Sequence, residues 1–169
     1  MKLPSAVVMA GGKGTRLSPL KPVLKVCEKP MIWWVVEIAK EFANNVYVAT
    51  VKGHPAEREL WSIHSRVIYT SGLGYENDVI EALSSVELPA LVLPSDVPFI
   101  SRQAIETLLN QCKASICTLI CETSFIGVSL WNQMRLNDYQ DIPFPQRIIN
   151  VNTQEDLQEI NKLCHDKSP

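Results

Sequence analysis

The chain of 169 residues has the composition of an ordinary globular domain, with 46% hydrophobic and 20% charged residues. Its 16 basic and 18 acidic side chains give a net charge of −2, which argues against broad nucleic-acid binding because such binding requires a basic face. No apolar run approaches the roughly 20 residues of a membrane span, and the N-terminus shows no signal-peptide pattern. We therefore expect one domain over residues 1–169, with no membrane span and no nucleic-acid partner.

Strand-like and helical patterns alternate along the chain. An apolar run at 6–10 that ends in glycines is typical of a buried parallel strand, and Pro30 opens a helix over 31–42. The later expected elements are strand 46–50, helix 55–61, strand 66–70, helix 75–84, strand 90–93, helix 102–111 capped by Ser101, strands 115–121 and 125–130, a loop at 134–145, strand 147–151, and helix 154–164 with a capping box of Thr153 and Asp156. This order predicts an α/β fold with a single, mostly parallel, Rossmann-like sheet flanked by helices.

A glycine-rich loop follows the first expected strand, where an α/β sheet binds its ligands. Three glycines in Gly11-Gly12-Lys13-Gly14-Thr15-Arg16-Leu17 allow a close backbone approach and point N–H groups at an anion. Leu17 stands where a dinucleotide fingerprint needs its third glycine, and no Gly-Lys-Ser/Thr sequence closes a P-loop. Several cations crowd this region, namely Lys13, Arg16, Lys21 and Lys25. The loop predicts a phosphate site, with a mobile glycine turn as the alternative.

Two further sheet-edge positions carry oxygen ligands. Asp96 follows the strand at 90–93, and one carboxylate is sufficient as the protein ligand of Mg²⁺. A turn aspartate or a helix cap is the alternative, but Pro98, Phe99 and Ile100 separate Asp96 from the expected cap at Ser101. Asn152 lies between the last strand and the last helix, where it serves either as a ligand or as a turn residue.

The loop from Ala10 to Leu17, followed by Lys21-Pro22, resembles the loop of nucleotidyltransferases related to the molybdenum-cofactor guanylyltransferases and sugar-phosphate pyrophosphorylases. The resemblance implies a nucleotide-diphospho-sugar transferase-like fold, catalytic roles for Arg16, Lys21 and Asp96, and Mg²⁺ held by Asp96 and Asn152, with Asn150 as the weaker second ligand. It also implies nucleotide binding by the loop residues Ala10, Gly11, Gly12, Lys13, Gly14, Thr15, Arg16 and Lys21.

A second glycine-bearing loop is Thr70-Ser71-Gly72-Leu73-Gly74-Tyr75, with Asp78 beyond it. Glycine turns before helices are common, so the loop by itself indicates little about function. Together with Gly127–Leu130 and Asn150–Thr153, it resembles the archaeal adenosylcobinamide-phosphate guanylyltransferases. The resemblance implies that Thr70, Ser71, Gly72 and Gly74 bind nucleotide, and that GMP passes from GTP to a corrinoid phosphate with release of pyrophosphate. The chain departs from that family at 122–126, where the family has a longer insertion that helps to hold the acceptor.

Three alternatives remain open. A molybdenum-cofactor guanylyltransferase uses the same chemistry, and a sugar-phosphate nucleotidyltransferase is disfavoured because such enzymes carry a longer acceptor-binding half. A non-catalytic nucleotide-binding module would lack the metal aspartate, whereas Asp96 is present. A homodimer is also compatible with the adjacent Trp33 and Trp34, one of which is free for an oligomer contact.

The cysteines and histidines have no expected catalytic role. Five cysteines without framework spacing predict reduced thiols and a cytoplasmic location. Cys112, Cys117 and Cys121 are expected to pack as small hydrophobic residues rather than as a zinc site. The three histidines form no triad or metal motif, and they are His54, His64 and His165.

Overall fold

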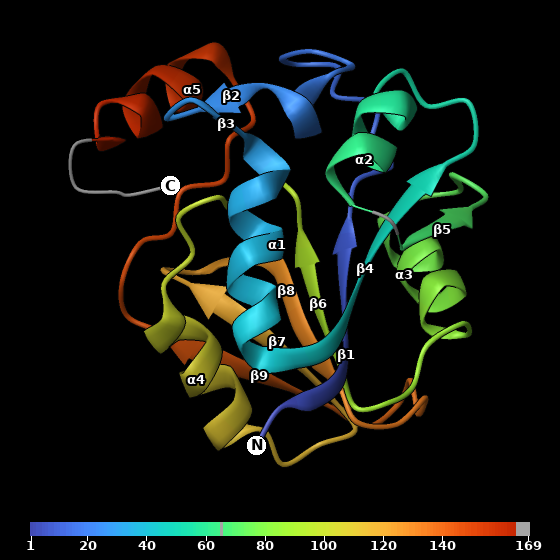
Figure 1. The fold of residues 1–169 in the computed structure, drawn as a ribbon. Helices are drawn as coiled ribbons and strands as arrows, with labels where there is room; N and C mark the ends of the chain where they lie inside the picture. The colour runs from blue at the N-terminus through green and yellow to red at the C-terminus, as the bar shows by residue number, and fades with distance from the viewer. Residues whose placement is uncertain (65, 165–169) are drawn as a thin grey trace.

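A seven-stranded sheet runs through the centre of the computed structural model, which describes residues 1–64 and 66–164 (Figure 1). Its strands are β1 Leu3–Met9, β4 Ala43–Val51, β5 Val67–Thr70, β6 Ala90–Pro94, β7 Ile116–Cys121, β8 Ser124–Trp131 and β9 Tyr139–Phe144. They lie in the order β5-β4-β1-β6-β8-β7-β9. Only β8 runs antiparallel to its neighbours, β6 and β7. The predicted α/β fold with a mostly parallel sheet is therefore confirmed.

Helices bury both faces of the first strands. Side chains alternate across a strand, so Ala6 and Val8 of β1 pack in one apolar cluster, whereas Val7 and Met9 pack in another. The first cluster lies under α1 Met31–Phe42, α2 Glu57–Ile63 and α4 Arg102–Gln111, and the second lies under α3 Tyr75–Leu83. This double burial explains why the strand at 6–10 reads as a continuous apolar run.

The last helix, α5 Gln154–Asn161, lies away from the sheet and packs on a small hairpin beside the first turn of α1 (Figure 1). The hairpin consists of β2 Lys25–Val26 and β3 Lys29–Pro30, and it follows a 3₁₀ turn, η1 Lys21–Val23. A separate apolar cluster joins these pieces through Val26, Met31, Val151 and Ile160. The chain segment after the glycine loop is thereby tied to the end of the protein.

The helix starts are predicted well where a proline or a capping side chain marks them. The bounds of α1 and α4 agree with the prediction, and the Ser101 hydroxyl accepts a hydrogen bond from the Ala104 N–H at 3.1 Å. Thr153 and Asp156 form the predicted capping box. The α5 helix ends at Asn161 rather than Cys164.

Two predictions near the end of the chain are wrong. The expected loop at 134–145 contains β9, which pairs with β7 from Ile116↔Tyr139 to Cys121↔Phe144. Pro143 is tolerated there because β9 is an edge strand and an edge position need not donate a ladder hydrogen bond. The expected strand at 147–151 is not a strand, since it crosses the end of β6 and makes one backbone bond, from the Val151 N–H to the Asp96 carbonyl oxygen at 2.8 Å.

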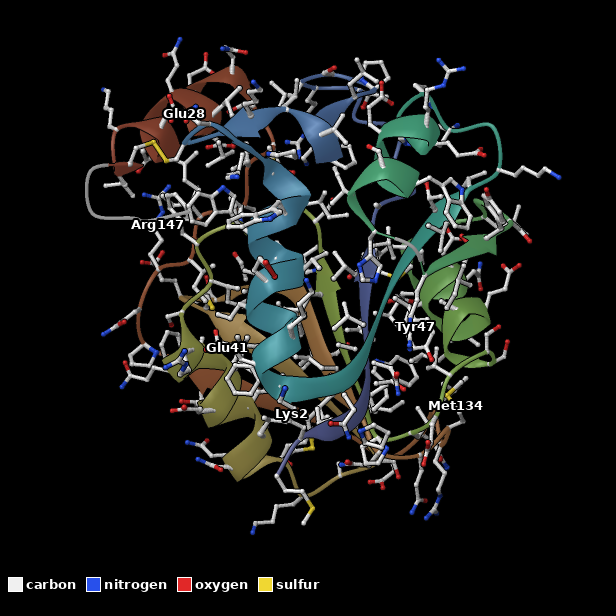
Figure 2. The ribbon with its side chains drawn as sticks, viewed as in Figure 1. Lys2, Glu28, Glu41, Tyr47, Met134 and Arg147 are labelled. Carbon is white, nitrogen blue, oxygen red and sulfur yellow. A yellow bond between two sulfur atoms is a disulfide. The ribbon has the colours of Figure 1, made fainter. Side chains whose placement is uncertain are left out.

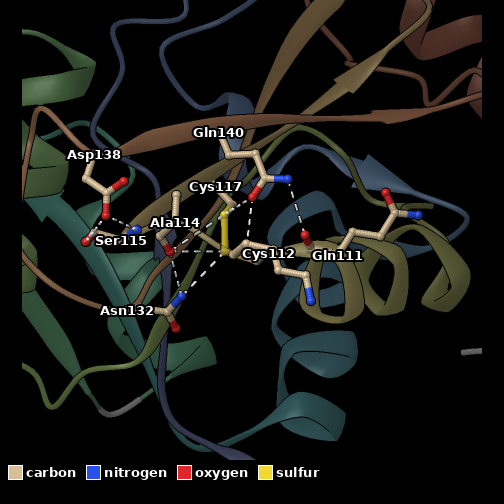
Figure 3. The surroundings of a disulfide bond; sticks show 9 residues. Gln111, Cys112, Ala114, Ser115, Cys117, Asn132, Asp138 and Gln140 are labelled. Carbon is tan, nitrogen blue, oxygen red and sulfur yellow. Dashed lines mark hydrogen bonds between the residues drawn. A yellow bond between two sulfur atoms is a disulfide. The ribbon is translucent and has the colours of Figure 1, made fainter.

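The prediction of reduced cysteines is wrong for four of the five. Cys27 of the hairpin turn is bonded to Cys164, near Glu28 in Figure 2. Cys112 lies just after α4, where the chain turns back and brings it to Cys117, so these two form a second disulfide rather than independent core residues (Figure 3). Cys121 is a free, buried thiol, as predicted. The cytoplasmic location stays a prediction, and His165 lies outside the described residues.

Within the described part of the chain, no helix is long and apolar enough to cross a membrane.

Candidate functional site

A cavity of about 510 Å³ opens at the carboxyl ends of β1, β4, β5 and β6. Parallel strands end at the same sheet edge, so the loops that follow them meet there. Residues from five segments line the cavity, within 9–14, 21–22, 51–54, 71–78 and 94–96. The predicted glycine loop, the second glycine loop and Asp96 are therefore brought together around one space.

The first glycine loop forms one wall of this cavity. Gly14 has φ +64°, and a Cβ at this position would lie 1.9 Å from the Ser18 carbonyl oxygen. The turn therefore requires glycine, and it is closed by a hydrogen bond from the Leu17 N–H to the Gly14 carbonyl oxygen at 3.0 Å. Gly11, Gly12, Lys13 and Gly14 line the cavity, whereas Ala10 is buried beneath it and Thr15 and Arg16 are exposed on the turn outside its lining.

His54 fixes the position of this loop. Its Nδ1 accepts a hydrogen bond from the Ala56 N–H at 3.1 Å, so the ring proton of the neutral tautomer is on Nε2, which donates to the Gly12 carbonyl oxygen at 2.7 Å. The residue is only 9% exposed. His54 and Lys52 both line the cavity, although neither is predicted from the sequence to belong to the site. The available signal was their place after the strand at 46–50, because that loop ends at the same sheet edge.

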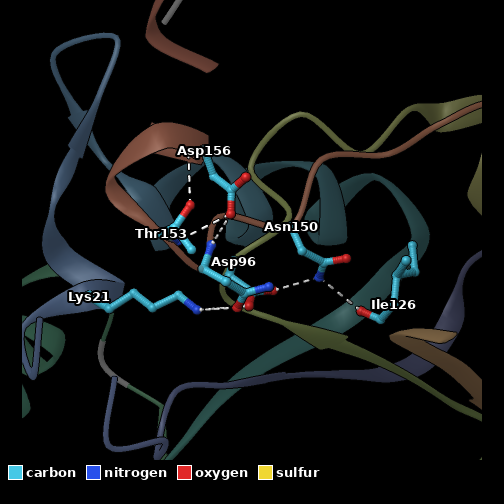
Figure 4. A network of polar contacts seen from close by, with 7 residues as sticks. Lys21, Asp96, Ile126, Asn150, Thr153 and Asp156 are labelled. Atoms are coloured by element: carbon cyan, nitrogen blue, oxygen red, sulfur yellow. Dashed lines mark hydrogen bonds and ion pairs between the residues drawn. The ribbon is translucent and has the colours of Figure 1, made fainter. Parts of the chain in front are cut away.

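A network of polar contacts in the site joins four chain segments (Figure 4). The Lys21 ammonium donates to Asp96 Oδ2 at 3.0 Å and to Asn152 Oδ1 at 2.9 Å. Asn150 Nδ2 donates to the other carboxylate oxygen, Asp96 Oδ1, at 3.0 Å, and to the Ile126 carbonyl oxygen at 3.4 Å. Asn152 thus presents an oxygen to the cation, whereas Asn150 orients the carboxylate.

The start of α5 holds Asn152 in place. Asp156 Oδ2 accepts hydrogen bonds from the backbone N–H groups of Asn152 and Thr153, each at 3.0 Å. Burial alone raises the pKa of Asp156, but these bonds and the Thr153 side chain outweigh it, so that the pKa of this carboxyl is lowered. An ionised Asp156 therefore fixes the backbone from which the Asn152 side chain projects.

The oxygen atoms of Asp96 and Asn152 suit a hard divalent cation. They already converge on a single positive centre, the Lys21 ammonium, and the side chains of Lys21 and Asp96 are each only 16% exposed. A carboxylate and an amide oxygen are ligands that Mg²⁺ accepts, with water and phosphate oxygens completing its shell. Among the described residues, no group of three or more His, Cys, Asp or Glu side chains gathers as a metal site.

The second glycine loop forms the opposite wall. Ser71, Gly72 and Gly74 line the cavity, whereas Thr70 is buried behind it. The Gly72 N–H donates to Asp78 Oδ1 at 2.9 Å, and Asp78 is itself almost fully buried. Carboxylates of α3 therefore shape this loop by binding its backbone.

Tyr75 stands at the first turn of α3, where the cavity meets β8. Its hydroxyl donates to the Gly127 carbonyl oxygen at 2.8 Å. Desolvation of the hydroxyl where it meets β8, and to a smaller extent the charge of Asp96, raise the pKa of Tyr75 above its usual range, so the hydroxyl stays protonated and remains a donor.

The chain has sequence relatives among proteins of known name. The chain is 34% identical over 113 residues to the adenosylcobinamide-phosphate guanylyltransferase of Methanocaldococcus jannaschii, which covers 62% of this chain and 58% of that protein. It is 35% identical over 129 residues to the bifunctional protein GlmU of Bacillus thuringiensis, over 72% of this chain and 28% of that protein. The chain thus spans little more than half the length of the first relative and about a quarter of the second.

The fold has relatives among solved structures. Molybdopterin-guanine dinucleotide biosynthesis protein A from Archaeoglobus fulgidus superposes with a TM-score of 0.72 and 17% identity, covering 96% of this chain and all of the other. The model of the MobA-like NTP transferase domain matches residues 6–150, from the first core strand to the residue that orients Asp96. The chain belongs to the MobA-like NTP transferase domain family.

Proposed function

We propose that the protein is a nucleotidyltransferase that moves GMP from GTP to the phosphate of adenosylcobinamide phosphate, giving adenosylcobinamide-GDP and pyrophosphate. The observation that best supports transferase activity is that a glycine-walled cavity meets the Lys21–Asp96–Asn152 cluster at one sheet edge. The identity of 34% to an adenosylcobinamide-phosphate guanylyltransferase supports the choice of base and acceptor.

The reaction is the attack of an acceptor phosphate oxygen on the α-phosphorus of GTP. A phosphate monoester has its second pKa near about 6 and is therefore already ionised at neutral pH. The oxygen–phosphorus bond forms as the bond to the pyrophosphate oxygen breaks, and no proton has to be removed from the nucleophile. The chain accordingly needs positioning and positive charge more than a general base.

The chain supplies both. Gly11, Gly12 and Gly14 line the cavity and would offer backbone N–H groups to the triphosphate, and Lys13 and Lys52 add charge at the cavity wall. Lys21 ends in a flexible four-carbon stem, so its ammonium can leave Asp96 and follow the charge that grows on the leaving pyrophosphate. Arg16 is exposed on the turn outside the cavity lining, and its role would be to bind phosphate oxygens that project from the cavity toward this turn.

Asp96 and Asn152 are the residues that would hold Mg²⁺, and the ion would neutralise phosphate charge when it is bound. Asn150 and Asp156 act behind them, the first on the carboxylate and the second on the backbone of Asn152. Tyr75 lines the cavity on the side of β8, where its hydroxyl donates to the Gly127 carbonyl oxygen.

A molybdenum-cofactor guanylyltransferase is the second candidate, because the matching family model is MobA-like and an Archaeoglobus fulgidus molybdopterin-guanine dinucleotide biosynthesis protein shares the fold. It differs in the acceptor and shares the nucleotide and the reaction.

The proposal is tested by measuring pyrophosphate release with Mg²⁺, each of the four nucleoside triphosphates, and either adenosylcobinamide phosphate or molybdopterin. We expect release above background with GTP and adenosylcobinamide phosphate, and a product with the mass of adenosylcobinamide-GDP. Release that depends on molybdopterin would favour the second candidate. Tight GTP binding without release on any acceptor would leave a nucleotide-binding module.

A further inference from the structure

A second cavity, of about 440 Å³, lies beside α3 on the face of the sheet formed by β7, β8 and β9. Every second residue of β8 faces this side of the sheet, and Gly127, Ser129 and Trp131 line the cavity in this way. The α3 helix packs on the strands nearer β1 and forms only one wall of this cavity, so the face beyond it stays open. Phe125, Leu136 and Tyr139 of its lining are 62%, 59% and 70% exposed. We refer to this second cavity as the aromatic groove.

The aromatic groove adjoins the first cavity, which the two glycine loops and Asp96 line. Tyr75 lines both, and its hydrogen bond to the Gly127 carbonyl oxygen joins α3 to β8 between them. Gly127 has φ +85°, and a Cβ there would lie 3.2 Å from both the Tyr75 hydroxyl and the Pro94 ring. Glycine at this position therefore permits the close approach of α3 to β8. We call the hydrogen-bonded pair of Tyr75 and Gly127 the Tyr75–Gly127 partition, and it lies against Pro94, two residues before Asp96.

The lining chemistry of the aromatic groove limits what fits it. Its walls are aromatic and aliphatic, and none of its lining residues is a Lys, Arg or His. The polar side chains are the carboxylate of Glu76 and the hydroxyls of Thr118, Ser129 and Tyr139 besides Tyr75, and the Ser129 hydroxyl already accepts from Trp131 Nε1 at 2.9 Å. A sugar phosphate would need a dense set of hydrogen-bond partners, whereas a broad ring system would cover the apolar walls.

A tight turn keeps this face open. The chain passes from β7 to β8 through Glu122 and Thr123 alone, with φ values of 58° and 152°. A turn of this length places no further chain over the groove. Exposed apolar surface of this kind, next to a reactive centre, is typical of a binding site.

From these observations we infer that the aromatic groove binds the ring body of the acceptor, a corrinoid, while the acceptor phosphate passes Tyr75 and Gly127 to reach the Lys21–Asp96 pair. The inference rests on the proposed function, because it assigns the second substrate of that reaction to this surface. It makes the groove the determinant of acceptor choice and leaves the nucleotide to the first cavity.

The test uses two neighbours in one loop. Leu136 lines the aromatic groove, whereas Met134, which is also exposed and is labelled in Figure 2, does not line it. We expect Leu136→Ser and Phe125→Ser each to raise the KM for adenosylcobinamide phosphate about tenfold, since each removes apolar contact area worth about 1.4 kcal/mol or more. The KM for GTP should stay within about twofold, and Met134→Ser should behave as the unaltered protein does.

Retention of the coloured adenosylcobinamide phosphate by the protein during ultrafiltration, without GTP, gives a readout that does not depend on turnover. Loss of acceptor affinity in both groove variants, but not in Met134→Ser, supports the inference. If the unaltered protein and its groove variants are active with equal KM values for the acceptor, the groove does not bind the acceptor, whereas the proposed transferase activity is supported. Retention that the groove variants lose, without pyrophosphate release, supports the groove and overturns the proposed function. Neither retention nor release overturns both.

Discussion

The two ends of the sheet present different kinds of surface to a ligand. The strands β5, β4, β1 and β6 end in loops that offer backbone N–H groups, lysines and the Asp96 carboxylate. The strands β8, β7 and β9 offer the side chains of an open strand face, most of them apolar. The first surface depends on backbone geometry, which any triphosphate can use, whereas the second depends on side-chain identity. Under the proposed function, the nucleotide would use the first surface and the acceptor would be selected by the second.

Each region also carries one disulfide. Cys27–Cys164 joins the hairpin after Lys21 to the chain just beyond α5, and so encloses both sides of the Lys21–Asn152 contact. Cys112–Cys117 closes a short loop at the start of β7. Removing each disulfide in turn separates their contributions to the stability of the protein.

The largest expected effect is on the free energy of unfolding, and it comes from the disulfide beside the Lys21–Asn152 contact. The Cys27–Cys164 bond spans 137 residues of sequence, against 5 for Cys112–Cys117. In the chain-entropy model, the first contributes about 5 kcal/mol to the free energy of unfolding and the second about 2 kcal/mol. Urea unfolding of the Cys27→Ser/Cys164→Ser and Cys112→Ser/Cys117→Ser variants should show this order. Equal losses, or a larger loss from the short loop, would contradict it.

The next largest effect is on turnover. Asp96→Ala removes the carboxylate that faces Lys21 and Asn150, and we expect pyrophosphate release to fall about 10³-fold because a group that gathers charge at the reacting phosphate is lost. Asp141→Ala, on the exposed side of β9, is the matched control and should retain activity. Urea midpoints of both variants should show that the fold persists. Activity retained in Asp96→Ala would remove this residue from the mechanism.

The two regions also differ in how far the sequence predicts them. The buried parallel strands near β1 carry continuous apolar runs bounded by glycine or a helix cap, and these patterns are local. The β9 strand depends on pairing with β7 and contains Pro143, so nothing in its own residues distinguishes it from a loop. The segment at 147–151 has strand-like residues but crosses the sheet edge, because its one backbone bond goes to Asp96. Long-range pairing, rather than local preference, decides both.

The same distinction applies to the site. Asp96, the glycine loop and Asn152 stand next to elements that the sequence marks, and the structure brings Asp96 and Asn152 to the same Lys21 ammonium. His54 was missed because its role is a contact with Gly12, 42 residues away. The Tyr75–Gly127 partition joins α3 to β8 and has no local pattern either. Contacts of this kind become visible only when the strand order is known.

His54 provides a smaller and more specific test of the nucleotide region. His54→Ala removes the donor to the Gly12 carbonyl oxygen, so we expect the KM for GTP to rise about tenfold, or about 1.4 kcal/mol, a typical cost for a lost buried hydrogen bond. The KM for the acceptor should change little, and His54→Gln, which keeps an N–H donor, should recover part of the loss. His64→Ala is the control, because His64 contacts the Val46 carbonyl oxygen instead. An equal rise in both KM values would make His54 a general structural residue.

The smallest expected effect lies at the start of α5 and depends on pH. Thr153→Ala removes a helix cap and should cost about 1 kcal/mol of unfolding free energy at neutral pH.

The pKa of Asp156 is lowered in the folded protein, so its contribution to stability is complete above the unfolded pKa of about 3.9 and is lost as the pH falls through the lower folded value. The stability difference between the unaltered protein and Asp156→Asn should therefore be present at neutral pH and shrink below about pH 4. Glu155→Gln, in the same exposed turn, is the control and should show no such dependence on the Asn152 backbone. A difference that persists unchanged at low pH would mean that Asp156 acts through the shape of its side chain, and that Asn152 is held by the hairpin and the Cys27–Cys164 bond instead.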